Sequence, residues 1–156
     1  MTDNISFTKF ETSTVMEPIH TNSMGNVHGG ELMRLMDNVA GLAAYKHAKG
    51  AVVTARVDDI VFHKPVHIPS ILTAVGQVIY VGTSSILVKN SMYVHDIKDY
   101  DNPELVFSAY VTFVHLKDNK PAKAPELVVK TKEEKALYQI GEQKYKEIKN
   151  KKQINK

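Results

Sequence analysis

Residues 16–38 of the chain, MEPIHTNSMGNVHGGELMRLMDN, combine residue types that can bind or activate an oxygen atom. His28-Gly29-Gly30 leads into a run with helical periodicity, and the first turn of a helix has backbone N–H groups without internal partners. Glycines there allow a ligand oxygen to approach the backbone closely. Such a position can bind a phosphate or polarise a carbonyl group. A nucleoside-triphosphate-binding loop is excluded, because no Gly-Lys-Ser/Thr follows.

Asp37 lies two turns into the same predicted helix. Its neighbours three or four residues away, Met33, Arg34, Ala40 and Gly41, are mostly small or apolar. We expect a carboxylate on such a face to lose part of its hydration, which would make it a better base. The alternative is an aspartate paired with Arg34 at a solvated corner of the helix.

Asn22 precedes the helix in a loop that also contains Gly25. An asparagine in a loop is usually a turn former, because its side chain bonds to nearby backbone groups. Its amide also carries both a donor and an acceptor without a net charge. Asn22 could therefore hold a water molecule or a carbonyl group instead.

The chain from Gly29 to His47 has the periodicity of one long helix. Apolar residues recur three and four positions apart, and Gly50 lies just beyond the end, as glycines often do after helices. The apolar residues are Leu32, Leu35, Met36, Val39, Leu42 and Ala43. Because they cover more than half of the circumference, we expect this helix to be buried.

Strand-like runs lie before and after this helix. They are rich in Val, Ile, Tyr, Phe and Thr, and they span Ser6–Met16, Val52–His63, Ile71–Tyr80, Ser85–Ile97 and Leu105–Leu116. The tight turn at residues 81–84 and the polar turn KDYDNPE at residues 98–104 join neighbouring runs, which must therefore be antiparallel. The sequence thus predicts an α+β domain in which a curved antiparallel sheet wraps around the helix. Its outer edge would pair with a second copy.

After Pro125 the pattern becomes helical again. Apolar residues between Leu127 and Tyr145 are interspersed with lysines and glutamates, which predicts a partly docked terminal helix. Residues 142–156 carry a charge of +4, whereas the remaining 141 residues carry −1. We expect this lysine-rich end to be solvated and frayed. The chain would then divide into a main domain at residues 1–124 and a C-terminal helix with a basic tail at residues 125–156.

Length and composition favour a single globular domain. The chain has 156 residues, 43% of them hydrophobic and 24% charged, which suffices for one core of ordinary size. It has no cysteine, so disulfides and cysteine nucleophiles are excluded. The sequence contains no secretory signal and no membrane-spanning run, and we therefore expect a cytoplasmic protein without a membrane partner. A near-neutral body with a basic end also argues against a nucleic-acid partner.

From Asn22 to Asp37 the chain reads NSMGNVHGGELMRLMD. This segment resembles the opening motif of the hotdog-fold acyl-CoA thioester hydrolases, whose usual form is N-x-x-G-x-x-[FH]-G-G-x-[LI]-[ML]-x-x-[ML]-D. The similarity continues with the same spacing through Val53-Thr54, Val57-Asp58, Phe62-x-Lys64-Pro65-Val66 and Val81–Ser85. It thus extends over residues 10–117.

The resemblance implies a fold, an assembly and residue roles. The hotdog fold is a curved antiparallel sheet around one long central helix, and its members form homodimers with shared active sites, often assembled as trimers of dimers. In the family, the aspartate that matches Asp37 is the general base or the nucleophile. The asparagine that matches Asn22 comes from the partner subunit and positions the water or the thioester. The threonine that matches Thr54 assists the aspartate in some members.

The resemblance also implies a segment that binds coenzyme A. In the family, this moiety is approached by the turn that matches Gly82, Thr83, Ser84 and Ser85. Many members have a basic residue after the glycine of this turn, whereas this chain has Thr83 there. We therefore expect part of the phosphate contacts to come from elsewhere, with Lys64 and Lys89 as candidates.

These roles predict a hydrolysis in which the backbone N–H of Gly30 binds the thioester oxygen, and His28 and Gly29 contribute to substrate binding. Asp37 then deprotonates a water molecule held by Asn22, or attacks the carbonyl carbon to give a mixed anhydride; the sequence favours neither route. Acyl thioesters are activated electrophiles, so the reaction needs no metal and no cofactor. Coenzyme A enters as part of the acyl-CoA substrate.

Three other functions are compatible with parts of the sequence. A hotdog domain can sense acyl-CoA without hydrolysing it, but no helix-turn-helix fits either end of the chain, and both Asn22 and Asp37 are present. A hydroxyacyl-thioester dehydratase would need a histidine base, for which His28 is the candidate. His63 and His67 have the spacing of two metal ligands on a helix, but a proline lies between them. We therefore expect no metal site.

Overall fold

The computed structural model of the chain describes residues 5, 6 and 8–154. Its main sheet is antiparallel, and its path runs in the order β2 (Lys9–Met16), β4 (Ser70–Val81), β5 (Ser85–Asp96), β6 (Asp99–Lys117) and β3 (Val52–Phe62), with β7 (Lys120–Pro121) paired to the end of β6. The remaining elements are β1 (Ile5–Ser6), which pairs with β8 (Leu127–Val128), the short 3-10 helix η1 (Pro18–His20), and the helices α1 (Gly29–Ala48) and α2 (Lys132–Ile154).

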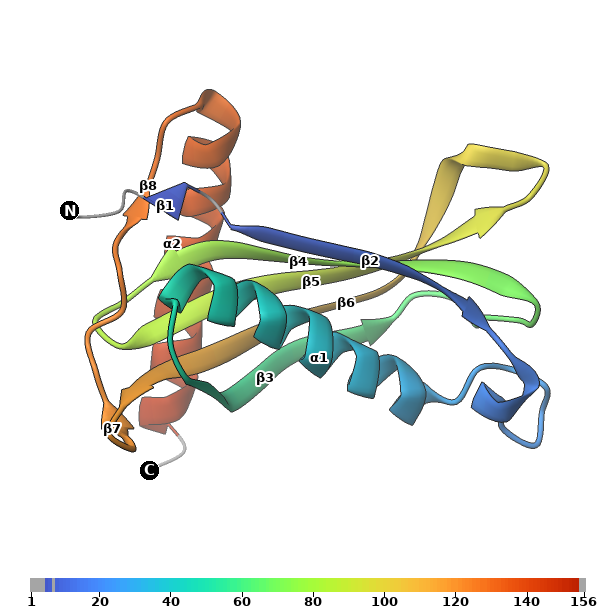
Figure 1. Cartoon of the computed structure of the whole chain (residues 1–156), viewed down its shortest axis with the longest axis horizontal. Helices are drawn as coiled ribbons and strands as arrows, with labels where there is room; N and C mark the ends of the chain where they lie inside the picture. Colours follow the sequence, from blue (N-terminus) through green and yellow to red (C-terminus); the bar gives the residue numbers. More distant parts are fainter. Residues whose placement is uncertain (1–4, 7, 155–156) are drawn as a thin grey trace.

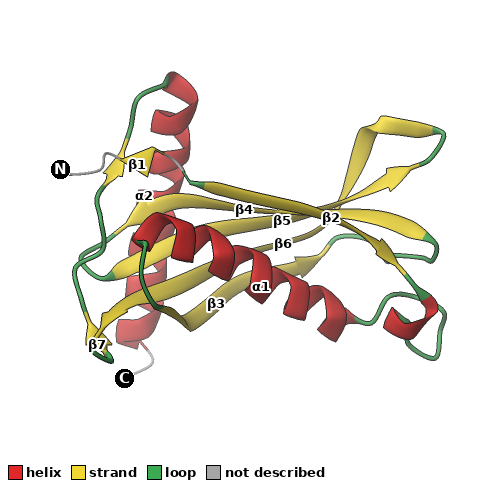
Figure 2. Ribbon diagram, viewed as in Figure 1, coloured by secondary structure: helices red, strands yellow, loops and turns green. Residues whose placement is uncertain are grey.

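The two helices lie on opposite faces of this sheet. Helix α1 runs along one face, and α2 crosses the other face near one end of the strands (Figures 1 and 2). Strand side chains alternate between the faces, so β4, β5 and β6 contribute to two separate apolar clusters. The larger cluster joins the sheet to α1, and a smaller one joins it to α2. The predicted α+β class and the antiparallel sheet are confirmed.

Helix α1 is buried on only one side within a single chain. Its buried side chains are Leu32, Met36, Val39, Ala40, Ala43, Ala44, His47 and Ala48. On β4, a Cβ at Gly76 would lie 3.0 Å from the Val39 carbonyl oxygen, so the helix backbone packs directly against the strand. On its other side, Met33, Leu42 and Tyr45 are exposed. The expectation of a buried helix is wrong for a single chain, because the sheet covers one face and not the whole circumference.

Helix α2 is docked on the sheet from Leu137 to Lys151, which corrects the expected frayed end. Ile148 is only 5% exposed and packs with Ile79 and Leu87 of the sheet. Lys144 and Lys151 extend to Asp59 on β3, with N–O distances of 2.7 and 3.4 Å. The hydrogen bond from Lys144 holds the pKa of the Asp59 carboxyl below its usual value. Ion pairs and apolar contacts therefore hold the basic segment through Lys151.

Of the polar segment 98–104, which was predicted to be a turn, residues 99–104 form strand. Strands β5 and β6 continue pairing as far as Asp96 opposite Asp99, so only Ile97 and Lys98 turn the chain. This end of the hairpin projects beyond the body of the sheet (Figure 1). Its polar residues face solvent on both sides, and so their composition resembles that of a turn.

No helix in the described part of the chain is both long enough and apolar enough to cross a membrane.

His47 connects the last turn of α1 to the segment that precedes β8. Its side chain is fully buried, and its Nε2 lies 2.8 Å from the carbonyl oxygen of Pro125. Because a carbonyl can only accept, Nε2 donates and carries the proton of the neutral ring. Nδ1 has no hydrogen-bond partner among the described residues. Burial therefore lowers the pKa of His47 below its usual value of 6.5.

This burial predicts a stability that depends on pH. A histidine whose pKa is lowered by folding contributes its full stability above its unfolded pKa, and this contribution is lost as the pH falls below about 6.5. We expect the urea midpoint of the protein to fall between about pH 8 and about pH 5.5. His47→Gln keeps a donor for Pro125 but does not titrate, so its midpoint should fall less. The exposed change His67→Gln is the control, and equal pH dependence in both variants would contradict the assignment.

Candidate active site

Asp37 and Thr54 meet between α1 and β3. The Thr54 hydroxyl donates a hydrogen bond of 2.7 Å to Asp37 Oδ1. The register of β3 against β6 shifts between Thr54 and Arg56, and such an irregularity changes the direction of side chains along a strand. Asp37 forms no ion pair with Arg34 in the described structure, so the alternative of a helical salt bridge is not observed. The threonine holds the carboxylate in place without neutralising it.

Asp37 is exposed in the single chain. We expected the Asp37 carboxylate to lose part of its hydration. In the single chain this expectation is wrong, because the face of α1 that carries Asp37 is uncovered. The same two elements also expose apolar side chains, namely Met33 and Leu42 on α1 and Val53 on β3. The outer edge of β3 has no neighbouring strand among the described residues. A second chain that covered this edge of β3 would also cover the Asp37 carboxylate.

Asn22 forms the turn that its residue type predicts. Its Oδ1 accepts hydrogen bonds from the backbone N–H groups of Met24 and Asn26, at 2.9 and 3.2 Å. Gly25 takes up the left-handed backbone conformation in this turn, with φ of 80°. The two backbone donors identify the oxygen of the amide, and they leave the NH₂ group without a partner in the described chain. The exposed side chain of Asn22 therefore offers two donors.

The start of α1 is capped by its own histidine. His28 is the N-cap residue, and its Nδ1 accepts the backbone N–H of Gly30 at 3.0 Å. The N–H that we expected to bind a ligand oxygen is therefore engaged in this conformation. The N–H of Gly29 has no partner among the described residues. It remains a free donor at the positive end of the helix.

Within one chain, Asn22 and Asp37 lie apart. Asp37 is eight residues beyond Gly29, which corresponds to about 12 Å along the axis of α1. Asn22 lies before the helix, in the loop whose Asn26 bridges to His67. The structure thus joins Thr54 to Asp37 in one chain and leaves Asn22 and the start of α1 at a separate place.

The turn between β4 and β5 borders a cavity of about 660 Å³. The cavity also contacts the segment 123–127 and one side of α2, and its lining includes Gly82, Thr83, Ser84, Ser85, Lys123, Glu126, Tyr138, Tyr145 and Lys149. Sequence analysis identified the turn but missed the residues beyond position 120. The seven-residue spacing of Tyr138 and Tyr145 in a helical pattern was a signal for a shared face.

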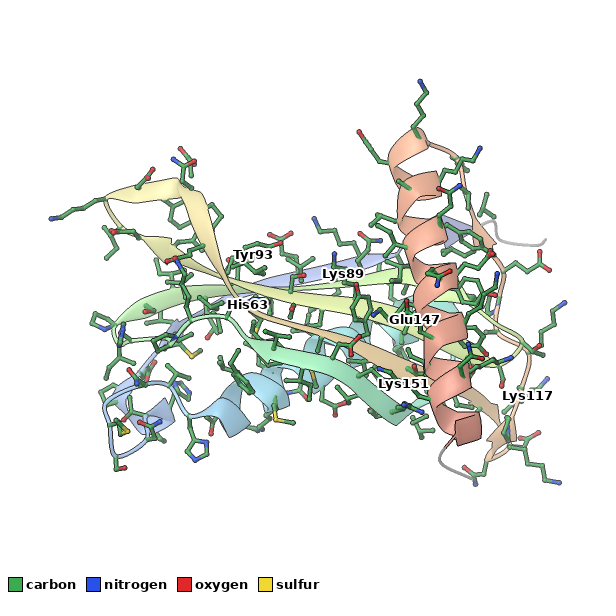
Figure 3. All side chains as sticks on the ribbon, turned by 180° about the vertical axis from the view of Figure 1, so that it is seen from behind. His63, Lys89, Tyr93, Lys117, Glu147 and Lys151 are labelled. Atoms are coloured by element: carbon green, nitrogen blue, oxygen red, sulfur yellow. The ribbon has the colours of Figure 1, made fainter. Side chains whose placement is uncertain are left out.

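The two lysines expected to contact phosphates lie away from this turn. Lys64 forms an ion pair with Glu104. It follows Phe62, which pairs with Phe107, whereas Ser85 of the turn pairs with Val114, roughly 20 Å further along β6. Lys89 is on the outer face of β5, beside α2 and outside the cavity (Figure 3). Within one chain, neither lysine replaces the missing basic residue at position 83.

The described residues contain no group of three or more histidine, cysteine, aspartate or glutamate side chains arranged to hold a metal ion. His63 donates or accepts a hydrogen bond with the hydroxyl of Ser108 at 2.8 Å.

Known proteins resemble this chain along most of its length. The family model of the thioesterase superfamily matches residues 24–99. YkhA, an uncharacterized acyl-CoA thioester hydrolase of Bacillus subtilis, is 35% identical over 91% of this chain and 82% of its own length. The chain spans only 40% of the length of the cytosolic acyl coenzyme A thioester hydrolase of Rattus norvegicus, to which it is 31% identical.

Solved structures resemble the fold as well. An acyl-CoA hydrolase from Staphylococcus aureus, in complex with butyryl coenzyme A, coenzyme A and coenzyme A disulfide, superposes with a TM-score of 0.80 at 33% identity. The alignment covers 94% of this chain and 93% of that one. An apo-hexameric acyl-CoA thioesterase gives a TM-score of 0.85 at 27% identity, with 92% of both chains covered.

Proposed function

This chain belongs to the acyl-CoA thioester hydrolase family within the thioesterase superfamily, and from that membership we propose that it hydrolyses acyl-CoA to a carboxylic acid and coenzyme A. Its hotdog fold is shared with hydrolases of this family. The observation that carries the proposal is the 2.7 Å hydrogen bond by which Thr54 orients the Asp37 carboxylate on the uncovered face of α1. A carboxylate fixed in this way can act as the general base that thioester hydrolysis needs.

Alanine variants of the Staphylococcus aureus hydrolase support this choice of residues. The asparagine, aspartate and threonine that were replaced there are separated by 15 and 17 residues. Asn22, Asp37 and Thr54 have the same order and the same separations. The match favours a common set of three groups in the two proteins.

The active site in this proposal is shared between two chains. The uncovered edge of β3 pairs with that of a second copy, and the exposed apolar residues of α1 and β3 become buried. The partner's Asn22 and the start of the partner's α1 then lie beside Asp37. Such dimers would assemble further into a trimer of dimers, in line with the hexameric thioesterase of similar fold.

In the reaction, the amide NH₂ of the partner's Asn22 donates a hydrogen bond to the attacking water or to the thioester. The water oxygen adds to the carbonyl carbon while Asp37 takes its proton. The carbonyl oxygen of the thioester then becomes negatively charged and accepts a hydrogen bond from a backbone N–H at the start of the partner's α1. Gly29 offers a free N–H, and that of Gly30 becomes accessible when the His28 ring turns away. The C–S bond then breaks, and the proton passes from Asp37 to the leaving thiolate.

The same carboxylate could instead attack the carbonyl carbon directly and form a mixed anhydride. A single turnover in ¹⁸O-labelled water tests the anhydride route. If water opens the anhydride at the Asp37 carboxyl carbon, the label enters Asp37 and the acid product of the first turnover stays unlabelled, whereas direct attack of water on the thioester places the label in the product. The water route is the one we propose.

Thiol release from acyl-CoAs of two to eighteen carbons tests the proposed function. We expect turnover of at least part of this series, with the preferred length set by the apolar residues that line the shared site. Binding without turnover across the whole series would contradict hydrolysis and would favour an acyl-CoA sensor. We also place the activity in the cytoplasm, as the name of the rat relative states for that protein.

A further inference from the structure

The apolar core between the sheet and α1 contains one polar side chain without a hydrogen bond. Asn90 on β5 is fully buried, and neither the oxygen nor the nitrogen of its amide has a partner among the described residues. On the basis of the proposed function, we propose that Asn90 recognises an oxygen atom on the acyl chain of the substrate, at a distance from the thioester. The preferred substrates are then medium-chain acyl-CoAs with a hydroxyl or keto group near the end of the chain.

The side chain of Asn90 points toward α1. Its neighbours two positions away on β5, Val88 and Met92, belong to the apolar cluster between the sheet and α1. Because side chains alternate along a strand, Asn90 enters the same cluster. An unpaired amide among apolar groups lowers the stability of a fold, so its presence calls for a compensating role.

Small residues surround the Asn90 amide. Gly76 on β4 and Ala109 on β6 lie directly opposite it in the two neighbouring strands. A Cβ at Gly76 would lie 3.3 Å from the Cα of Ala40, so α1 passes directly above this part of the sheet. None of these three neighbours has a side chain longer than a methyl group. No bulky group therefore shields the amide on these sides.

Asn90 is within reach of an acyl chain whose thioester lies at Asp37. Opposite residues of paired strands, such as Asn90 and Gly76, have Cα atoms about 5 Å apart. The contact described above places the Cα atoms of Gly76 and Ala40 about 5 Å apart. Ala40 follows Asp37 by one helical turn, again about 5 Å. These three steps put the Cα atoms of Asn90 and Asp37 at most about 15 Å apart, which an extended chain covers in about twelve bonds.

Two methionines flank this path. Met36 precedes Asp37 on α1, Met92 follows Asn90 on the same face of β5, and both are buried in the cluster. Methionine is unbranched and flexible, so it can change its conformation when an apolar chain enters. The carbons of such a chain stay among apolar groups, and only its distal oxygen meets the amide. The amide offers a donor and an acceptor to a hydroxyl or keto oxygen, whereas a carboxylate would bring an uncompensated charge into the core.

Three thioesters of equal chain length test the proposal: decanoyl-CoA, 10-hydroxydecanoyl-CoA and 3-hydroxydecanoyl-CoA. We expect kcat/KM of the parent protein to be about tenfold higher for the 10-hydroxy substrate than for decanoyl-CoA, because an apolar chain leaves the amide unpaired. The 3-hydroxy substrate carries its hydroxyl beside the thioester, away from Asn90, and should show no such preference. Equal kcat/KM for the two hydroxylated substrates would overturn the assignment.

Asn90→Leu keeps nearly the same shape but cannot form a hydrogen bond. It should abolish the preference for the 10-hydroxy substrate. It should also raise the urea midpoint of the protein, because an unpaired polar group leaves the core. A lower midpoint would show that the amide is already satisfied without substrate, for instance by a resident water molecule, and this result would reject the proposal.

Thr112→Val is the matched control. The Thr112 hydroxyl is also buried without a partner among the described residues. It lies opposite Leu87, which belongs to the cluster between the sheet and α2, and hence on the other face from Asn90. Its replacement should raise the urea midpoint in the same way but leave the substrate preference unchanged. Loss of the preference in both variants would attribute it to the fold and not to Asn90.

Binding separates this inference from the proposed function. If the parent protein hydrolyses none of the three thioesters, the proposed function fails for this chain length, and the same thioesters serve as stable ligands in calorimetry. About tenfold tighter binding of 10-hydroxydecanoyl-CoA than of decanoyl-CoA, lost in Asn90→Leu, then supports the site, and equal affinities or no binding reject it. Hydrolysis without any preference leaves the proposed function intact and rejects only the role of Asn90.

Discussion

Replacement of Asp37 with asparagine is expected to lower kcat for acyl-CoA hydrolysis about 10³-fold, the usual effect of removing a general base. The amide has the shape of the carboxylate, and its oxygen can still accept the hydrogen bond from Thr54. It cannot take a proton from water, so the chemical step fails while binding is retained. Steady-state thiol release gives kcat, and calorimetry with coenzyme A gives the affinity, which should stay within about twofold of the parent value.

Two further variants show that this effect belongs to the site. Asp101→Asn makes the same chemical change on the exposed hairpin and should leave kcat unaltered. Thr54→Val removes the hydrogen bond but keeps the carboxylate, so we expect a smaller loss of about tenfold. Retention of the parental rate by Asp37→Asn would rule out the aspartate as the base.

Mixing of two inactive variants is expected to restore activity if the site is shared. In a dimer of one Asn22→Ala chain and one Asp37→Asn chain, the intact Asp37 of the first faces the partner's Asn22 of the second. After refolding of an equal mixture, about a quarter of all sites should be intact, because each site needs one chain of each kind. Thiol release measured before and after refolding detects the recovery.

The matched control uses two residues that meet within one chain. Asp37→Asn mixed with Thr54→Val should recover no activity beyond that of Thr54→Val alone, because Thr54 bonds to Asp37 of its own chain. Recovery in this control, or none in the Asn22 mixture, would show that the division of the site between the chains is wrong.

Sequence periodicity predicted the elements that are covered on one face. The helix at residues 29–47 and the strands around it follow patterns that burial imposes on every third or fourth residue, or on every second residue. The projecting end of β5 and β6 is exposed to solvent on both faces. Its sequence therefore lacks the apolar periodicity of a buried strand and resembles a turn. Helix α2 does have an apolar face through Leu137, Gly141, Tyr145 and Ile148. The sequence therefore predicted a partly docked helix, but the lysines that dominate the composition of residues 142–156 led to the expectation of a frayed end.

The candidate site was predictable only in part, because local sequence patterns do not encode contacts between distant segments. The resemblance of motifs named both Asp37 and Thr54, and the structure shows a hydrogen bond between them. The exposure of Asp37 in the single chain could not be predicted, because the apolar periodicity of α1 does not show which of its faces the sheet leaves uncovered. Lys123 and Lys149 line one cavity because α2 docks beside the β4–β5 turn, which is a tertiary contact between distant segments. No local pattern encodes it.

The loop around Asn22 also explains why an amide stands at this position. An aspartate would accept the same two backbone N–H groups from Met24 and Asn26, and the turn would form equally well. In the proposed shared site, however, a carboxylate would direct only lone pairs and a negative charge toward the partner's Asp37. The amide oxygen thus maintains the turn, and the proposed role would fall to the amide nitrogen, which an aspartate lacks.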